Sequence, residues 1–448
     1  MQMKRSDFRF TDADYLLYAH TIYNNPYIHF DLYPLQEDIA MLSCQNFDGV
    51  NRLLTGGAGG GGKTMLLSAL ALQFMNYPNY RCLVTRKGYR ELIGSGSVFD
   101  IIKRVEGLNV RESSPIKITS PCGAEIHFKA FADERHKQDV KGESYHTILN
   151  DEASELDESV LRFLNRSVRK STDDPIPLRV VNASNPSATS TTEYLRDKYV
   201  DGELPYVEMG YKDNPYIDTR TYEEALMELD YIDRQYQMKG NWHYKVQVGD
   251  LINRDEIEAQ LVTNLQTPLQ LQLIGIDLAG KGKDKFAICC YELLANGWEY
   301  IRDFAQTQSS YVEDLLLRFV MKYNKPNEYP TTSAVVIEQE GGGSPVYAQR
   351  YFQDLLSDFG IPVMLKHPSG SKFQRARPLL HSIKMGNTKL NKESTDMDEF
   401  IDESVGLNPI KNDKSPNLVD SASLVRNYLH EEIIGKQTRF TTGRRIGG

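Results

Sequence analysis

Residues 56–64 read "GGAGGGGKT", and this glycine-rich segment sets the class of the N-terminal half of the chain. The apolar run "VNRLLTGG" (50–57) leads into it, and "KTMLLSALALQFMN" (63–76) follows with apolar residues at helical spacing. Glycines let successive backbone N–H groups turn toward phosphate oxygens, and the N-terminal end of the following helix adds positive potential. The segment therefore predicts a phosphate-binding loop between a strand and a helix. A flexible linker is the alternative, but a linker requires neither the flanking strand and helix nor the Lys-Thr ending.

The last eight residues of this segment match G-x-x-x-x-G-K-[ST], the phosphate-loop pattern of ATPases and GTPases. Gly57, Gly59 and Gly62 are expected to shape the loop around the phosphates of ATP. Lys63 is expected to contact the β- and γ-phosphates, and Thr64 to bind Mg²⁺.

Strands alternate with helices through the rest of the first half, which predicts an α/β fold with a mainly parallel sheet covered on both faces. The expected strands are 80–87, 145–153 and 178–186, with a hairpin over 116–131. A second alternating pattern begins near residue 271, after a connector over 246–270. Its expected strands are "LQLIGIDLAG", "FAICCYEL", "WEYIRDFAQ", "SAVVIEQE" and "IPVMLKH", with helices between and after them.

An acidic pair ends the strand "HTILNDEA". Asp151 is expected to bind Mg²⁺, and Glu152 to orient and deprotonate the attacking water. A solvated turn is the alternative for an Asp-Glu pair alone. The phosphate loop upstream in the same predicted sheet favours the catalytic interpretation.

Other candidates for the nucleotide site rest on single residues. Ser184 and Asn185 end the strand "VVNASNP", where they either sense the γ-phosphate or form the turn before a proline. Arg86 and Arg90 lie at and beyond the end of another strand, as transition-state cations or as surface charges. Gln36, upstream of the loop, is a candidate for recognising adenine.

The second half carries acidic residues inside apolar segments, where an unpaired carboxylate is costly and a metal ion offsets the cost. Asp277 lies in "LIGIDLAG", Glu338 ends "SAVVIEQE", and Asp420 lies on a late helix in "NLVDSASLV". Their order on a first strand, a fourth strand and a last helix predicts an RNase H-like nuclease that binds two Mg²⁺ or Mn²⁺ ions. Glu340 competes with Glu338 as the ligand, and Asp284 is either an accessory ligand or solvated.

Composition limits the class of protein. The chain has 448 residues, with 40% hydrophobic and 25% charged residues, enough for two globular domains. No apolar run reaches the ~20 residues that span a bilayer, and no apolar segment typical of a signal peptide follows the first basic residues. Five cysteines without CxxC spacing predict reduced thiols. Because the net charge is −9, any DNA contact must come from local basic groups.

Together these motifs resemble the large terminase subunit of tailed double-stranded DNA bacteriophages. The resemblance extends over nearly the whole chain and also includes "GYKDNPYI", "MKGNWHY", "VVIEQEGGG" and "KFQRARPLL". It implies an ASCE-type P-loop ATPase domain over 1–245 with a lid at about 205–245. A linker over 246–270, a nuclease domain over 271–432 and a basic tail over 433–448 would follow.

By this resemblance the protein is a motor that pumps viral DNA through the portal protein into a preformed shell and then cuts it. The expected partners are double-stranded DNA, the portal protein and the small terminase subunit. The resemblance also implies a ring of copies on the portal, a monomer alone, and a location in the host cell cytoplasm. A helicase with an attached nuclease and a non-catalytic assembly scaffold are the alternatives.

The sequence departs from the family pattern at two points. Pro416 and Asn417 stand where family members often have paired aspartates, a few residues before the last acid, which leaves fewer carboxylates for a second metal. Lys141 stands where some relatives have an arginine, so the arginine that acts in trans is either Arg86 or an unidentified residue.

Local basic groups are the candidates for DNA contacts, with a solvated surface as the alternative for each. They are Lys372, Arg375 and Arg377 in "KFQRARP" and Lys281, Lys283 and Lys285 in "GKGKDK". The tail "GKQTRFTTGRRIGG" is a candidate docking peptide for the portal.

Overall fold

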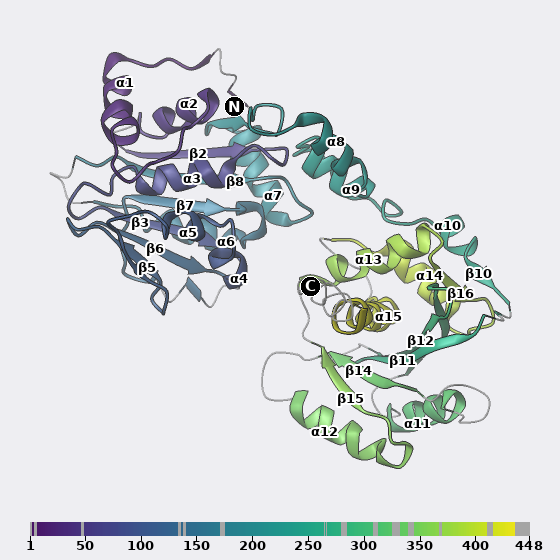
Figure 1. Cartoon of the computed structure of the whole chain (residues 1–448). Helices are drawn as coiled ribbons and strands as arrows, with labels where there is room; N and C mark the ends of the chain where they lie inside the picture. The colour runs from purple at the N-terminus through teal and green to yellow at the C-terminus, as the bar shows by residue number, and fades with distance from the viewer. Residues whose placement is uncertain are drawn as a thin grey trace, which may run out of the picture. The chain divides into compact units, whose positions relative to one another are not determined.

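The structure is a computed structural model, and its residues divide into two compact units, Met1–Lys245 and Val246–Gly448 (Figure 1). The residues described are 2–3, 7–45, 49–132, 136–137, 140–170, 175–263, 265, 267–278, 285–307, 312–324, 332–338, 345–366, 370–409 and 415–434. Glu340, Asp284, Lys281, Lys283 and most of the predicted docking tail lie outside these ranges. No helix among the described residues is long and apolar enough to cross a bilayer.

The first unit contains a sheet with the described strand order β1-β9-β2-β8-β7-β3-β6-β5-β4. The strands from β9 to β6 in this order are parallel, and β5 and β4 are antiparallel. Their bounds are β1 (Gln2–Met3), β2 (Val50–Gly56), β3 (Arg81–Arg86), β4 (Asn109–Arg111), β5 (Lys117–Thr119), β6 (Glu125–Ala130), β7 (Thr147–Asp151), β8 (Leu178–Ser184) and β9 (Tyr206–Glu208).

Helices cover both faces of this sheet, as continuous apolar strands require. One core is shared by α2, α3, α5 and the sheet, and another by α6, α7 and the sheet, with Trp242. The helices are α1 (Asp12–Tyr18), α2 (Pro34–Leu42), α3 (Lys63–Leu72), α4 (Tyr89–Ile93), α5 (Val98–Ile102), α6 (Glu158–Leu164), α7 (Ser190–Leu195), α8 (Thr219–Met227) and α9 (Tyr231–Asp233). Short helical turns are η2 (Ala19–Tyr23), η4 (Ala153–Glu155), η5 (Arg196–Val200) and η6 (Arg234–Met238).

The strand order brings the predicted nucleotide-binding segments to one edge. Strand β8 lies between β2, which leads into the phosphate loop, and β7, which ends at Asp151. Because these three strands are parallel, the segments that follow them meet at the same edge of the sheet. This is the order expected of an ASCE-type ATPase, with an added strand between the two nucleotide-binding strands.

The second unit contains a mixed sheet with the described order β10-β16-β13-β12-β11-β14-β15. Strands β11, β12 and β13 are antiparallel, whereas β14 runs parallel to β11. The strands are β10 (Leu261–Val262), β11 (Leu269–Asp277), β12 (Phe286–Leu294), β13 (Glu299–Thr307), β14 (Ala334–Glu338), β15 (Val363–Lys366) and β16 (Thr388–Asn391). The helices are α10 (Arg254–Glu258), α11 (Val312–Tyr323), α12 (Pro345–Leu355), α13 (Lys372–Lys384), α14 (Met397–Gly406) and α15 (Asn417–Tyr428), with η8 (Ser357–Phe359) and η9 (Leu429–Ile434).

Helices α13, α14 and α15 cover one face of this sheet, and α11 and α12 cover the other (Figure 1). Helix α15 approaches β11 closely at Gly275, where an added Cβ would lie 2.2 Å from Val425 Cγ2 and 2.4 Å from the Ser421 carbonyl oxygen. Only glycine at position 275 allows this approach, which brings α15 beside the strand that ends in Asp277.

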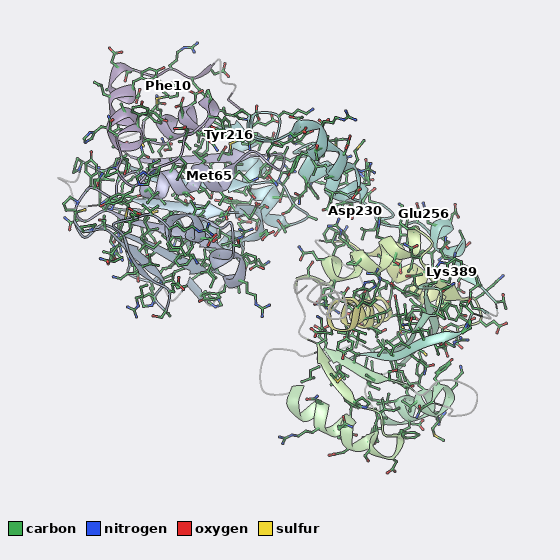
Figure 2. All side chains as sticks on the ribbon, viewed as in Figure 1. Phe10, Met65, Tyr216, Asp230, Glu256 and Lys389 are labelled. Carbon is green, nitrogen blue, oxygen red and sulfur yellow. The ribbon has the colours of Figure 1, made fainter. Side chains whose placement is uncertain are left out.

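The predicted connector over 246–270 contains ordered elements that join the second unit. Helix α10 lies within it, β10 pairs in parallel with β16, and β11 already begins at Leu269. Glu256 on α10 and Lys389 on β16 are labelled in this part of the unit in Figure 2. Oε1 of Glu256 lies 2.9 Å from Nζ of Lys384, and Nζ of Lys389 donates a 2.6 Å hydrogen bond to Oε1 of Gln260. The five cysteines form no disulfide bonds.

Candidate functional site

The phosphate loop connects the end of β2 to the start of α3, and side chains from distant segments hold its carbonyl groups. Within residues 60–62, three successive carbonyl oxygens accept hydrogen bonds from Asn214 Nδ2 at 2.8 Å, Tyr33 Oη at 2.7 Å and Gln36 Nε2 at 2.9 Å. The N–H groups of the same three residues have no acceptor in the described part of the chain. Within one peptide unit, the carbonyl of a residue and the N–H of the next residue point in opposite directions. Holding the carbonyls of Gly60 and Gly61 on one side therefore turns the N–H groups of Gly61 and Gly62 to the other side, where an anion can bind.

Two glycines meet conformational requirements of this loop. Gly60 and Gly62 have φ values of 73° and 75°, in the left-handed region that glycine adopts without strain. An added Cβ at Gly62 would also lie 2.8 Å from Gln36 Nε2. The pattern of glycines recognised in the sequence therefore follows from backbone conformation and from contact with Gln36.

Lys63 is held in the middle of the site. Its side chain is almost fully buried, and its Nζ donates a 2.5 Å hydrogen bond to Oδ1 of Asn185, just after β8. The neighbouring Ser184 is fully buried, and its hydroxyl donates at 2.9 Å to Oγ of Ser154, two residues after Glu152. Asn185 therefore contacts the phosphate-loop lysine, whereas Ser184 joins the end of β8 to the turn that carries Glu152.

Asp151, which is buried, and Arg86, which is partly exposed, form an ion pair at the end of β7. Arg86 Nη1 lies 3.0 Å from Asp151 Oδ2, and the Nε of Arg86 is buried without a partner in the described chain. Burial raises the pKa of Asp151 to about 6, although Arg86 and Lys63 oppose this shift. Glu152 has φ 49° and ψ 54°, a left-handed conformation that is strained for glutamate and common at functional sites.

The structure places the other candidates for nucleotide contacts differently. Gln36 is buried, with its amide engaged by the phosphate loop and by the backbone N–H of Tyr33, so recognition of adenine would require it to leave these partners. Arg90 lies exposed on α4. Lys141 is also exposed. None of the described contacts identifies an arginine that acts in trans.

A chain of buried polar side chains runs away from the acidic pair across the sheet. Thr85 Oγ1 donates to Asn150 Oδ1 at 2.7 Å, and Asn150 Nδ2 donates to Asn182 Oδ1 at 2.8 Å. Asn182 Nδ2 then donates to the hydroxyl of Tyr199 on η5 at 3.0 Å. The sequence analysis did not identify this network, and its only signal was the presence of asparagines inside two apolar strands.

The three predicted nuclease acids come together in the second unit. Asp277 and Glu338 are the last residues of β11 and β14, which are parallel neighbours, and Asp420 lies in the first turn of α15. The guanidinium of Arg375 reaches Glu338 Oε2 at 3.3 Å and Asp420 Oδ1 at 3.8 Å. Lys372 Nζ lies 2.6 Å from Asp420 Oδ2. Two basic residues of α13, predicted as DNA contacts, are therefore paired with the acids.

Charge repulsion and burial make this cluster receptive to cations. Burial raises the pKa of Asp277 to about 8, with Asp420 and Glu338 adding to the shift and Lys372 and Arg375 opposing it. Burial likewise raises the pKa of Asp420. Neither carboxylate oxygen of Asp420 accepts a well-directed hydrogen bond from the described residues. Buried carboxylates whose oxygens accept no well-directed hydrogen bond are suitable ligands for a divalent cation.

This arrangement of the acids is not yet a coordination sphere. Among the described residues, no three His, Cys, Asp or Glu side chains are grouped closely enough to hold a metal ion. The ammonium of Lys372 and the guanidinium of Arg375 instead balance part of the negative charge. The residues fit a divalent cation by their chemistry, and binding would require these two basic groups to give up their contacts.

Glu403 is a further residue at this site that sequence analysis did not identify. From α14, its Oε2 accepts hydrogen bonds from the backbone N–H groups of Leu418 at 2.9 Å and Val419 at 3.1 Å. It thereby caps the N-terminus of the helix that carries Asp420. Burial raises its pKa to about 7. Glu403 thus places a carboxylate from α14 at the N-terminus of α15, where Pro416 and Asn417 provide none.

The remaining basic candidates have other partners or lie outside the described residues. Lys285 Nζ lies 3.4 Å from Glu399 Oε1, an exposed ion pair. Lys281, Lys283, Asp284 and Glu340 fall outside the described ranges, so their predicted roles stay predictions.

Comparisons of the sequence with known proteins find no matching family model and no significant match among curated proteins. Comparisons of the fold do find matches. The large terminase of a thermophilic bacteriophage superposes with a TM-score of 0.65 at 14% identity, covering 90% of this chain and 100% of that one. The same phage protein in complex with ADP gives 0.64 at 14% identity, covering 90% and 100%. Its complex with ATP-gamma-S gives 0.63 at 15% identity, covering 89% and 99%.

The chain therefore has the fold of a phage large terminase over most of its length. An N-terminal P-loop ATPase fold is followed by an RNase H-like fold, as the motifs predicted. The resemblance inferred from the motifs is confirmed at the level of the fold.

Proposed function

We propose that this protein is the ATPase and endonuclease of a viral DNA-packaging motor. ATP hydrolysis in the first unit drives double-stranded DNA through a portal into a procapsid, and the second unit cuts concatemeric DNA. The observation that carries the proposal is the presence of two chemically distinct sites in one chain. One is a phosphate loop with an acidic strand end, and the other is a triad of acids on an RNase H-like fold.

In the first unit, the N–H groups of residues 60–62 and Lys63 bind the phosphates of ATP. Thr64 and Asp151 hold Mg²⁺, which when bound neutralises phosphate charge. Glu152 accepts a proton from the attacking water. Asn185, already in contact with Lys63, is positioned to report loss of the γ-phosphate to β8.

In the second unit, Asp277, Glu338 and Asp420 hold Mg²⁺ or Mn²⁺. These ions, when bound, activate water and stabilise the leaving oxygen of a phosphodiester. Lys372 and Arg375, which are paired with the acids, would have to leave them for a metal ion to be held, and would then be free to contact DNA phosphates next to the cut. Before metal and substrate arrive, the ion pairs with Lys372 and Arg375 hold Asp420 and Glu338 in place.

The proposed partners are double-stranded DNA, the portal protein and the small terminase subunit, in the cytoplasm of the host cell. A ring of copies on the portal would bring a neighbour's arginine to the nucleotide. Arg86 is already paired with Asp151, which supports assigning the trans-acting role to another residue. The lid over 205–245 would change its contacts with the phosphate loop as ATP binds, since Asn214 already holds that loop.

The test separates the two activities by single substitutions. Glu152→Gln is expected to bind ATP but lose hydrolysis and packaging while still cutting DNA with Mn²⁺. Asp277→Ala is expected to lose metal-dependent cutting while keeping ATPase activity. Glu106→Gln and Asp358→Asn, which change exposed carboxyl groups in the two units, are the matched controls.

Normal hydrolysis by Glu152→Gln would remove that residue from its role. Retained cutting by Asp277→Ala would refute the metal site. Unwinding of a forked duplex by the wild-type protein would favour a helicase, and absence of both activities would favour a scaffold.

A further inference from the structure

A basic pocket lies in the first unit, on residues that the two candidate sites do not use. It has a volume of about 420 Å³ and lies among β2, α6, α7 and η5. The residues that matter here are Arg52, Arg162, Arg166 and Lys198, together with Tyr194 and Tyr199. Four cationic side chains thus surround one hollow in a chain whose net charge is −9.

Three of these four cations lack a counter-charge within the described chain. Arg162 is the exception, since its Nε lies 2.6 Å from Glu158 Oε1 and its guanidinium lies 4.7 Å from the centre of the Tyr194 ring. Arg52, Arg166 and Lys198 form no side-chain hydrogen bond or ion pair with the described residues. Like charges gathered without counter-charges repel one another, and a polyanion bound in the pocket would relieve that repulsion.

The basic residues first expected to contact DNA contrast with this pocket. Lys372 and Arg375 are paired with the protein's own acids, and Lys285 is paired with Glu399. Cations already paired must exchange one carboxylate for one phosphate, whereas unpaired cations gain a new partner and release counterions. The pocket is therefore the better site for phosphate contacts.

The pocket is connected to the nucleotide site by sequence and by hydrogen bonds. Helix α6 follows the acidic pair, and η5 follows β8 through α7. Asn150, adjacent to Asp151, bonds to Asn182, and Asn182 bonds to the hydroxyl of Tyr199 in the pocket wall. A shift of β7 relative to β8 on hydrolysis would therefore reach a side chain that lines the pocket.

We propose that this pocket binds the phosphate backbone of double-stranded DNA, and that the nucleotide state changes its grip through Asn182 and Tyr199. This inference rests on the proposed function and names the surface with which the motor holds its substrate. Contact with phosphates alone is independent of base sequence, as translocation along a genome requires.

The test measures binding of a fluorescent duplex by anisotropy, in EDTA to prevent cutting, at several salt concentrations. The double variant Arg166→Ala/Lys198→Ala is compared with Arg111→Ala/Arg220→Ala, which removes two exposed cations elsewhere in the same unit. A charge-conserving swap, Arg166→Lys/Lys198→Arg, is the second control. Circular dichroism checks that each protein is folded.

We expect the pocket variant to lower the slope of log binding constant against log salt by about two, or roughly 0.9 per lost contact. The control pair and the swap should keep the wild-type slope. An unchanged slope in the pocket variant would overturn the proposal. The proposal would also be overturned if the pocket variant no longer bound poly-glutamate but still bound DNA like the wild type. The latter result would identify the pocket as a docking site for an acidic peptide.

The coupling is tested with Tyr199→Phe, which lacks the hydroxyl that Asn182 contacts. It should lose the difference in DNA affinity that the wild type shows between ATP-gamma-S and ADP. If that difference persists, the coupling is refuted. ATP hydrolysis and DNA cutting by the same wild-type preparations test the proposed function separately, since the salt slope requires neither reaction.

Discussion

Replacing Asp277 with asparagine should remove a pH dependence of stability that the metal-free second unit carries. Asp277 lies at the end of β11 among Asp420, Glu338 and the basic residues of α13. Burial and the neighbouring acids raise its pKa from 3.8 to about 8. Between these two pH values the folded protein holds a proton at this carboxyl that the unfolded chain has released.

The sign and size of the effect follow from this difference in bound protons. The unfolded state binds fewer protons, so the free energy of unfolding falls as pH rises, by about 1.4 kcal/mol per pH unit. The stabilisation is complete below pH 3.8 and is lost as pH rises toward about 8. From pH 5 to pH 7 the wild type should lose roughly 3 kcal/mol that Asp277→Asn does not lose.

The assay is urea unfolding in EDTA at pH 5, 6 and 7, with the tryptophan of the second unit as the reporter. The chain has two tryptophans, and the Trp242→Phe background leaves Trp298 alone. The other titrating groups are present in both proteins. The difference between the two proteins in how their free energy of unfolding changes with pH therefore reports the proton held by the acid cluster. Asp358→Asn, which changes an exposed carboxyl in the same unit, should behave as the wild type.

The reasoning would be refuted if the free energy of unfolding changed with pH by the same amount in the wild type and in Asp277→Asn between pH 5 and pH 7. That result would mean that Lys372 and Arg375 compensate the acids fully, and that no proton is held in the cluster. Saturating Mn²⁺ should reduce the difference, because a bound ion displaces the proton.

Three further substitutions test other contacts. Tyr33→Phe removes the hydroxyl that donates to the Gly61 carbonyl at 2.7 Å, so ATP binding measured by calorimetry should weaken about fivefold, or ~1 kcal/mol; unchanged affinity would mean that the loop is held without it. Arg179→Met deletes a fully buried guanidinium that donates to Gln73 Oε1 and the Leu70 carbonyl, so urea unfolding of the first unit should show a loss of about 3–5 kcal/mol, only partly restored in Arg179→Lys. Glu403→Ala removes the cap of α15 and should cost the second unit about 1–2 kcal/mol by the same method, with a smaller loss indicating that water replaces the carboxylate.

Much of the fold could be predicted because its signals are local. The glycine positions report backbone conformation, as Gly60 and Gly62 show by their positive φ values. Apolar runs of strand length ending in acids predicted β7, β11 and β14 correctly, because a parallel sheet buries its strands and presents their carboxyl ends together.

Partners distant in the sequence could not be predicted. Nothing in the spacing of the sequence indicates that Tyr33 and Asn214 hold adjacent carbonyls of the phosphate loop. Gln36 was expected to recognise adenine, but its amide supports the loop instead in this structure. The basic groups of "KFQRARP" were assigned to DNA, whereas Lys372 and Arg375 lie against the acids.

By itself, the sequence determined the two classes of fold, the residue types at each strand end and the likeness to large terminases. These properties depend on periodicity and backbone conformation, which act within a few residues. Only the tertiary structure decided which side chain holds which group: the carbonyl partners of the phosphate loop, the pairing of Asp151 with Arg86, the carboxylate of Glu403 on α15 and the unpaired cations of the basic pocket. Such contacts depend on the register of strands and the packing of helices, so they are defined only once the whole unit has folded.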